Sequence, residues 1–354
     1  MQDTRIFRAM YSYYPAQSCR GLTMNLRLLL VVLMTCRALQ AQTSGTDWNI
    51  ARPGVKEVQV PVASLKITAK FKVGRHPDWI LISGDTIWFA TSNPNTLQRI
   101  DALTNKVISK LSLPGEACSG LAFGFDSVWV PLCGNHPSLV RVDSLTNKIS
   151  VRLPLGPPSA EGAITISRDS VWIVTDENGT LTRVNPKTNA VQQKISIPSG
   201  SFNPLFSEDI VWITGVDRNV LTAVDAATGE VLDSIPVGPK PRFLTAGGGS
   251  IWTLNQGDGS LTRVDAKSRK VMATITLGIP GPGGDICYSA DSVWASVFGI
   301  PLSQIDVKTN KLLRQWVGQG GDSLRFGQDS LWLTDSHHGL VWRIRKEETQ
   351  SLVQ

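Results

Sequence analysis

The sequence has few of the residues that usually mark an enzyme or a metalloprotein. Among 354 residues there are only four histidines and five cysteines. No Cys-x-x-Cys-His motif occurs, so nothing indicates covalently attached haem. No Cys-x-x-Cys or His-x-Glu spacing indicates a zinc site either. Motifs of this kind therefore do not identify the chemistry of the protein.

The sequence also lacks a basic region of the kind that binds nucleic acid. The formal net charge is +6, but residues 1–41 carry five arginines and one aspartate, that is 5 − 1 = +4, which leaves +2 for the rest. Beyond residue 41 no run of lysine or arginine alternates with stacking aromatic residues. We therefore predict no nucleic-acid partner. The apolar content of 42% is that of an ordinary globular protein and does not favour disorder.

The apolar run near the N-terminus is too short to span a bilayer. It covers residues 28–34, follows the short basic stretch 24–27, and precedes small residues suited to cleavage near residue 41. This pattern is typical of a signal peptide, so we expect residues 1–41 to be a targeting segment that starts at Met24 or at Met1. We predict no transmembrane span.

The same segment indicates where the protein works. A signal peptide directs a protein to the periplasm or out of the cell, so we predict an exported protein. Cys36 follows Thr35, where a lipoprotein signal has a smaller residue, which disfavours a lipid anchor.

What the sequence does contain is a repeat built around tryptophan. The phrase Asp126-Ser127-Val128-Trp129-Val130 recurs with variations, and its tryptophan returns at intervals of 41, 43, 40, 40, 42 and 38 residues. The seven copies are Trp88, Trp129, Trp172, Trp212, Trp252, Trp294 and Trp332. Seven units of about 40 residues without helical periodicity are typical of a radially repeated all-β ring. We predict a seven-bladed β-propeller of four-stranded antiparallel blades.

One complete repeat can be followed between residues 120 and 155. We expect strands a, b, c and d at 120–125, 127–132, 138–142 and 148–153. Strand b is apolar on both sides, as a strand between neighbouring blades should be, whereas strand d alternates like an outer edge. The turn from c to d recurs as Asp-x-x-Thr-Asn-Lys or a close variant, and we interpret it as structural, because Asp caps amides and Asn tolerates positive φ.

The last repeat predicts how the ring closes. After residue 345 no Thr-Asn-Lys turn and no strand d follow, whereas residues 65–73 form an alternating strand with no partner before it. We predict that this N-terminal strand completes the last blade, since pairing the two ends removes exposed edges. The expected domains are a targeting segment at 1–41, a linker at 42–61, the propeller at 62–346 and a polar tail at 347–354. We expect a monomer.

Loops that join d to the next a, and b to c, lie on one face of such a ring, which we call the top face. All four histidines fall in these loops, with several other polar residues. The set comprises His76, His136, His337 and His338, with Glu116, Glu161, Asp176, Asp217, Arg242, Asn255, Asp258 and Asp285. We predict a ligand pocket there, lined by His76, His136, Glu161, Asp176, Arg242 and Asn255. Because loops are polar in most proteins, a top face without a function is the alternative.

Three cysteines remain beyond the targeting segment. Cys118 and Cys133 lie equidistant from the turn at 125–126, so they should face each other across the a–b hairpin. We predict a disulfide between them, since an exported compartment permits oxidation, with two buried thiols as the alternative. Cys287 is expected to be a small buried residue rather than a nucleophile.

Three repeated segments carry a resemblance to known propellers. They are Ser-Leu-Thr-Arg-Val-Asp at 260–265, Thr-Asn-Lys-Val at 104–107, and Asp-Ser-Val-Trp. Over about residues 62–346 the chain resembles the YVTN-type seven-bladed propellers and the streptogramin B (virginiamycin B) lyase-like group. The YVTN-type resemblance implies a binding or surface-associated propeller.

The resemblance to the lyases implies a chemistry. Those enzymes open a cyclic depsipeptide by elimination across its ester bond, with a magnesium ion and a histidine base on the top face. The resemblance implies His338 or His337 as the base, and Glu161 or Asp176 near the cation. The Trp-Phe-Thr-Glu-type strands of the lyases are replaced here by other sequences, for example at 88–92.

Taken without the resemblance, the residues do not indicate catalysis. No pair of carboxylates and no Ser-His-Asp order can be placed within bonding distance from the sequence. We predict an exported propeller that binds a small ligand or a partner protein through its top-face loops without catalysis. The alternatives are a magnesium-assisted streptogramin B-type lyase and a propeller subunit of a redox enzyme.

Overall fold

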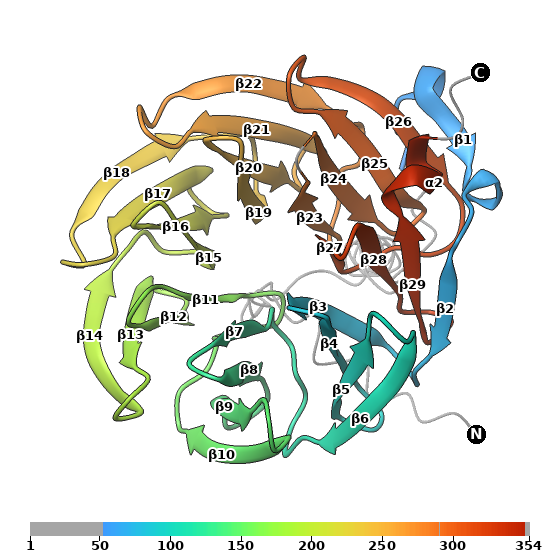
Figure 1. Ribbon diagram of the computed structural model, residues 1–354. Helices are drawn as coiled ribbons and strands as arrows, with labels where there is room; N and C mark the ends of the chain where they lie inside the picture. Colours follow the sequence, from blue (N-terminus) through green and yellow to red (C-terminus); the bar gives the residue numbers. More distant parts are fainter. Residues whose placement is uncertain (1–51, 290, 351–354) are drawn as a thin grey trace, which may run out of the picture. The chain divides into compact units, whose positions relative to one another are not determined.

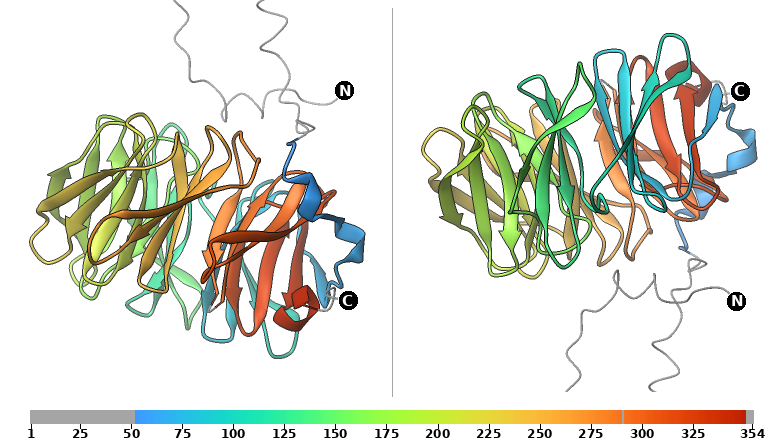
Figure 2. Two further views of the ribbon diagram at one scale, coloured as in Figure 1. Left: turned by 90° about the horizontal axis from the view of Figure 1, so that it is seen from above. Right: turned by 90° about the horizontal axis from the view of Figure 1, so that it is seen from below.

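The computed structural model describes residues 52–289 and 291–350. The predicted targeting segment, with Cys19 and Cys36, lies outside these residues. Within them, the chain forms seven separate β-sheets placed as blades around a common axis (Figure 1). The side views show the blades edge-on, with connecting loops at both faces (Figure 2). The predicted seven-bladed β-propeller is confirmed.

The blades follow the chain, and each is given from its innermost strand outward. Blades 1 to 3 are β3 (Pro77–Ser83), β4 (Thr86–Thr91), β5 (Thr96–Asp101) and β6 (Lys106–Ser112); β7 (Ala122–Gly124), β8 (Ser127–Leu132), β9 (Ser138–Asp143) and β10 (Lys148–Leu153); and β11 (Ile164–Ile166), β12 (Val171–Asp176), β13 (Thr180–Asn185) and β14 (Ala190–Ser196). Blades 4 and 5 are β15 (Ser201–Ser207), β16 (Ile210–Gly215), β17 (Val220–Asp225) and β18 (Val231–Pro236); and β19 (Pro241–Gly247), β20 (Ser250–Asn255), β21 (Ser260–Asp265) and β22 (Val271–Thr276). Blades 6 and 7 are β23 (Asp285–Tyr288), β24 (Ser292–Val297), β25 (Ile300–Asp306) and β26 (Lys311–Val317); and β27 (Leu324–Gly327), β28 (Ser330–Asp335) and β29 (Leu340–Arg345), completed by β2 (Ala69–Lys72).

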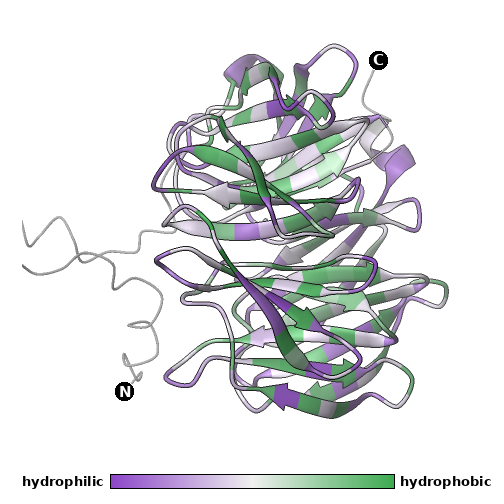
Figure 3. Ribbon diagram, turned by 90° about the vertical axis from the view of Figure 1, so that its left-hand side faces the viewer, coloured by the Kyte–Doolittle hydropathy of each residue, from purple (hydrophilic) through white to green (hydrophobic). Residues whose placement is uncertain are grey.

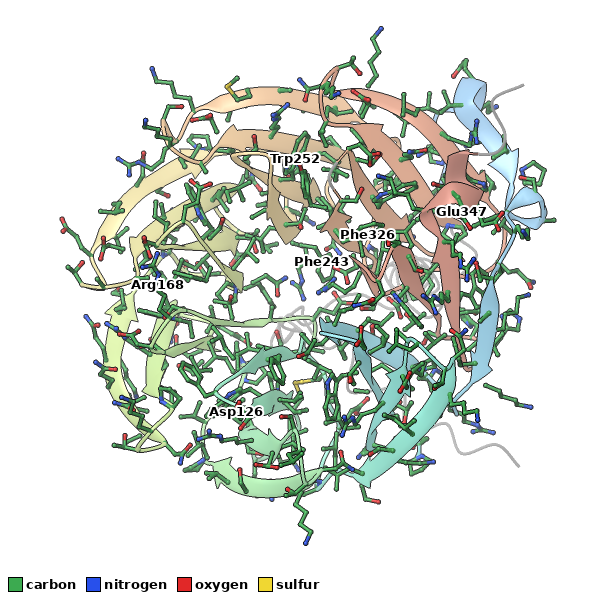
Figure 4. The ribbon with its side chains drawn as sticks, in the orientation of Figure 1. Asp126, Arg168, Phe243, Trp252, Phe326 and Glu347 are labelled. Carbon is green, nitrogen blue, oxygen red and sulfur yellow. A yellow bond between two sulfur atoms is a disulfide. The ribbon has the colours of Figure 1, made fainter. Side chains whose placement is uncertain are left out.

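The core lies between adjacent blades and is built from their second strands. All seven repeat tryptophans lie on these strands and are at most 1% exposed. Figure 4 shows Trp252 within blade 5, with Phe243 of the innermost strand nearer the axis. Hydrophilic colour gathers in the turns at the two faces, while hydrophobic colour is found mainly on the strands, some of which also carry hydrophilic stretches (Figure 3). The strands with alternating apolar residues thus form the outer edges of the blades, and the strands that are apolar on both sides lie between neighbouring blades.

The N-terminal strand closes the ring as the sequence predicts. Strand β2 pairs antiparallel with β29, from Ala69 opposite Arg343 to Lys72 opposite Leu340. Phe71 stacks on the repeat tryptophan Trp332, with ring centroids 5.9 Å apart. The last blade is therefore built from both ends of the propeller.

The two flanking segments also carry structure. In the range expected to be a linker, β1 (Gln59–Pro61) pairs in parallel with β26 as a fifth strand of blade 6, between the 3₁₀ turns η2 (Lys56–Val58) and η3 (Val62–Ser64). After β29, the short helix α2 (Lys346–Gln350) follows. The Lys66 ammonium lies 2.6 Å from the Glu348 carboxylate, which ties this helix to the N-terminal segment.

The turns between the third and fourth strands have the structural role expected of them. In blade 1 the Asp101 carboxylate accepts the amides of Leu103 and Thr104 at 2.9 and 2.8 Å, and Asn105 has φ +54°. These bonds lower the pKa of Asp101, first through the Thr104 amide. Short polar side chains that cap amides and adopt positive φ explain why this phrase recurs.

An arginine in the third strand joins each of five blades to the next one. In blade 3 the Arg183 guanidinium lies 5.0 Å from the Trp172 ring centroid and donates to the Ala227 carbonyl of blade 4 at 2.9 Å. The equivalent pairs are Arg99 with Ser144, Arg141 with Pro186, Arg263 with Val307 and Arg343 with Ala102. The last pair closes the ring between blades 7 and 1. Blades 4 and 6 have Ala223 and Gln304 at this position.

We expect Arg183→Met to lower the free energy of unfolding by about 1–3 kcal/mol, because it removes a buried cation–π contact and an interblade hydrogen bond. The Arg183 side chain is 6% exposed. The control is Arg168→Met, whose side chain is 79% exposed in a surface ion pair and should change stability by less than about 0.5 kcal/mol. Urea unfolding followed by tryptophan fluorescence measures both. Equal losses in the two variants would contradict the interblade role.

Candidate functional site

Six ionisable side chains converge near the ring axis at the top face. Each innermost strand begins at this face, because the connection from the previous blade leads into it. The residues at or beside these starts are Asp78, Glu161, Arg242, Asp285, Asp322 and Arg325, from five of the seven blades. The Asp78 and Asp322 carboxyls each interact electrostatically with Glu161 and Asp285. We call these six residues the axial cluster.

One ion pair in the cluster crosses a whole blade. Arg242 of blade 5 lies 3.4 Å from the Glu161 carboxylate, which belongs to the connection into blade 3. Its guanidinium lies 3.6 Å from the ring centroid of Phe202 of blade 4 and donates to the Ala160 carbonyl at 3.1 Å. The predicted site residues Glu161 and Arg242 are thus brought together, and a planar charged surface results beside an aromatic ring.

A second ion pair joins blades 6 and 7. Arg325 donates to the Asp285 carboxylate, which is almost fully buried. Asp285 also accepts the Ser323 hydroxyl at 3.2 Å and the amides of Leu324 and Ile286 at 3.0 and 2.8 Å. With this set of donors the carboxylate of Asp285 is well satisfied, and it holds the start of β27 against β23.

The other two acids of the cluster are harder to ionise. Burial raises the pKa of Asp78 to about 8, and the negative charges of Asp285 and Glu161 act in the same direction. Burial also raises the pKa of Asp322 well above its usual value, and the negative charges of Asp78 and Glu161 raise it further. These effects favour the protonated form of both carboxyls. Strongly shifted acids in a polar cluster are typical of functional sites.

The backbone at Asp78 is also unusual. His76 and Trp79 have φ values of +46° and +57°, and the Asp78 carboxylate accepts the Trp79 amide at 2.7 Å. A bulky tryptophan rarely adopts positive φ, so this stretch stores local strain. The Trp79 side chain itself is 8% exposed and packs into the core.

Three of the four histidines share one hollow, which we call the histidine pocket. It forms where the connection into blade 1 meets the β28–β29 connection of blade 7, and its volume is about 400 Å³. Its lining residues are Lys72, Gly74, Arg75, His76, Ser336, His337, His338 and Gly339. His136 is exposed in the β8–β9 connection of blade 2 and is not among them.

The histidines of the pocket differ in their partners. The His338 Nδ1 lies 2.8 Å from the Asp335 carboxylate, whose side chain is 3% exposed. His337 packs edge-on against Phe298, with ring centroids 5.7 Å apart. Burial lowers the pKa of His76, and the neighbouring His337 and Arg75 lower it further. His338 also lines a second hollow of about 420 Å³ with Leu340 and Trp342.

Three of the predicted ligand residues lie outside the axial cluster and the pocket, namely His136, Asn255 and Asp176. Asn255 is fully buried inside blade 5, where its amide donates to Ser260 and Thr262 at 3.0 and 2.9 Å. These bonds give it a structural role in the blade instead of a place at the surface. Asp176 ends β12 of blade 3, on the top face, and is half-buried.

The cysteines behave as two different types. Cys118 and Cys133 form the predicted disulfide, with their Cα atoms 5.7 Å apart. The bond joins the connection into β7 to the end of β8, at the top face of blade 2. Cys287 is buried, and this burial raises the pKa of its thiol, which makes the sulfur a poor nucleophile.

Sequence reasoning did not single out Asp78, Asp322, Arg325 or Phe202. A usable signal was present, because aligning the repeats places Asp78 after Pro77 where blade 5 has Arg242 after Pro241. A charged residue at the start of an innermost strand marks the axial position. The most evident repeat, the tryptophan, lies on the second strand of each blade and gives no information about this axial position.

Within the part of the chain that the structure describes, no three or more histidine, cysteine, aspartate or glutamate side chains are arranged to hold a metal ion. Among residues 52–289 and 291–350, no helix has the length and apolar character needed to cross a membrane.

Comparison with known proteins shows a similarity of fold and nothing further. No family model matches the chain, and no curated protein does either. Solved structures do match, among them the selenomethionine-substituted virginiamycin B lyase from Staphylococcus aureus. The two chains share 16% identity with a TM-score of 0.64, over 78% of this chain and 98% of that chain. At this identity the likeness shows a common propeller fold.

Proposed function

We propose that this protein is an exported binding propeller that recognises a small polar ligand at the axial cluster, without catalysing its conversion. The observation that carries the proposal is the pair Asp78 and Asp322, two carboxyls with raised pKa beside two complete ion pairs. A ligand that carries a cationic nitrogen stabilises the ionised form of these acids, so ligand binding and the release of protons favour each other.

The composition of the cluster defines the ligand further. The two ion pairs balance the charges of Glu161 and Asp285, so Asp78 and Asp322 supply the acceptors that remain for a donor on the ligand. Arg242 stacked on Phe202 offers a flat surface for a planar or apolar part of it. The favoured ligand class is a small amine or guanidinium compound.

Export is supported by two independent features. The Cys118–Cys133 disulfide is stable in an oxidising compartment and rare in the cytosol. The signal-peptide pattern at 1–41 indicates the same route.

The test uses the purified protein with spermidine, L-arginine and choline as probes. At about pH 7.5, at least one probe should raise Tm by about 3 °C or more at saturating concentration, with release of up to about one proton per carboxyl on binding. Calorimetry in buffers of different ionisation enthalpy measures the protons. The Asp78→Asn/Asp322→Asn variant should lose both effects, whereas Asp217→Asn, an exposed acid on the same face, should keep them. Absence of any shift, or an unchanged shift in the double variant, would refute the proposal.

A second function is favoured by one contact and by the fold. The buried Asp335 carboxylate orients the His338 ring at 2.8 Å, an arrangement suited to a general base, and the chain shares its fold with a virginiamycin B lyase. Under this alternative, protein with magnesium should convert a type B streptogramin to a linear product, and His338→Gln should abolish the conversion. Mass spectrometry that finds only intact cyclic compound would exclude it.

A further inference from the structure

We infer that the histidine pocket is a binding site for an oxyanion, such as a carboxylate or sulfate group, and that it binds more tightly as the pH falls. This goes beyond the proposed function, because the pocket lies at the joint of blades 7 and 1 and takes a ligand of the opposite charge. It also uses none of the six residues of the axial cluster.

The geometry of the pocket is built by two backbones in close contact. The Val73 amide donates to the Gly339 carbonyl at 3.0 Å. A Cβ atom placed on Gly339 would clash with the Gly74 carbonyl oxygen, and Gly339 has φ +68°. Glycine at residue 339 therefore lets the two connections approach and hold their polar side chains around one hollow of about 400 Å³.

The charged residues that line the hollow are basic. Lys72 and Arg75 contribute +2, and protonation of His76 would add to this charge, while the Asp335 carboxylate beside His338 lies outside the lining. None of the described residues that line the hollow is acidic. A concave surface of this kind attracts anions, and arginine and imidazolium groups donate hydrogen bonds to oxyanions.

The charged groups around His76 and His337 come from several elements. Lys72 comes from β2, Arg75 lies on the connection shared with His76, and Asp335 of β28 contacts His338. On the side of the β24–β25 connection, the ring of Phe298 packs on His337. The acid nearest to His76 in sequence is Asp78.

The pH dependence follows from these neighbours. In the protein alone, burial opposes the protonation of His76, and the positive charges of His337 and Arg75 oppose it further. An anion in the hollow would offset the effect of these charges. Binding of the anion and uptake of protons must therefore favour each other. Because imidazoles titrate near pH 6.5, the effect falls in the range from about pH 5.5 to about pH 8.

Sodium sulfate and sodium acetate are suitable probes, because neither changes its charge appreciably over this range. Isothermal titration calorimetry on the full chain at constant ionic strength should show sulfate binding about ten-fold tighter at pH 5.5 than at pH 8. The His76→Gln/His337→Gln variant should lose about ten-fold in affinity at pH 5.5 and most of the pH dependence. His136→Gln provides the matched control, since it removes an exposed histidine of the same face outside the pocket, and should bind as the unchanged protein does.

A measurement on the unchanged protein tests the inference even if the double variant does not fold. NMR titration of the histidine rings should show the pKa of His76 rising when sulfate is added. No rise at His76, or no binding at pH 5.5, would overturn the inference, as would equal losses in the double variant and in His136→Gln. The Asp78→Asn/Asp322→Asn variant should still bind sulfate, so failure of this site is distinguishable from failure at the axial cluster.

Discussion

A chain that begins at residue 75 is expected to lose about 5 kcal/mol or more of stability, and to aggregate, because it lacks the strand that completes blade 7. The truncation removes Leu65, Phe71 and Val73, which are 5–8% exposed. Each buried apolar side chain contributes about 1.5–3 kcal/mol, and the total stability of a domain is about 5–15 kcal/mol. It also exposes the edge of β29, which pairs with β2 over four residues.

The matched truncation begins at residue 62 and removes β1 but keeps β2. Because β1 adds only three residues to a blade that already has four strands, this chain should fold and lose about 1–2 kcal/mol. Thermal unfolding with light scattering separates the two truncations. A third protein, Phe71→Ala in the full chain, tests the contact with Trp332 alone and should lose about 3 kcal/mol. If the chain starting at 75 were as stable as the one starting at 62, closure by β2 would not hold the ring.

Replacing Asp78 by asparagine is expected to stabilise the protein near pH 8 by a few kcal/mol, and hardly at all near pH 4. The pKa of Asp78 is raised from its usual value of 3.8 to about 8 in the folded protein. Between these values the folded state holds a proton that the unfolded state has released. The free energy of unfolding therefore falls as the pH rises from about 4 to about 8, and asparagine, which cannot ionise, escapes this loss.

The control for this prediction has the opposite sign. Turn hydrogen bonds lower the pKa of Asp101, so its contribution is present above the unfolded pKa and is lost as the pH falls. Urea unfolding of the unchanged protein, Asp78→Asn and Asp101→Asn at several pH values measures the differences. A stability gain at Asp78 that did not vary with pH would show that packing, and not ionisation, is the cause.

Both predictions concern residues that the sequence treats differently. The alternating strand at 65–73 and the missing last strand were visible in the repeat pattern, so closure of the ring was predictable before any coordinates. The raised pKa of Asp78 was not, because it depends first on burial in the folded ring and then on Asp285 and Glu161, which lie 207 and 83 residues further along the chain. Patterns of neighbouring residues in the sequence reflect strand and turn preferences, whereas a pKa shift depends on burial and on distant groups that come together in the fold.

The histidines show the same division. Their loops all belong to the top face, which the order of strands within each repeat decides. His76, His337 and His338 share a hollow, but His136 does not line it. This difference arises because blade 7 is joined to blade 1, a contact that no single repeat contains.

The sequence by itself determined the architecture of this protein: seven blades, the tryptophan-centred second strands, the Asp-capped turns, the facing cysteines and the strand that closes the ring. These are consequences of short-range spacing and of alternation along the chain. The tertiary structure alone decided which charged side chains meet at the axis, which arginines cross to the next blade and which histidines form a pocket. A ring brings residues together according to angle and radius, and neither quantity can be obtained from the separation of two residues in the sequence.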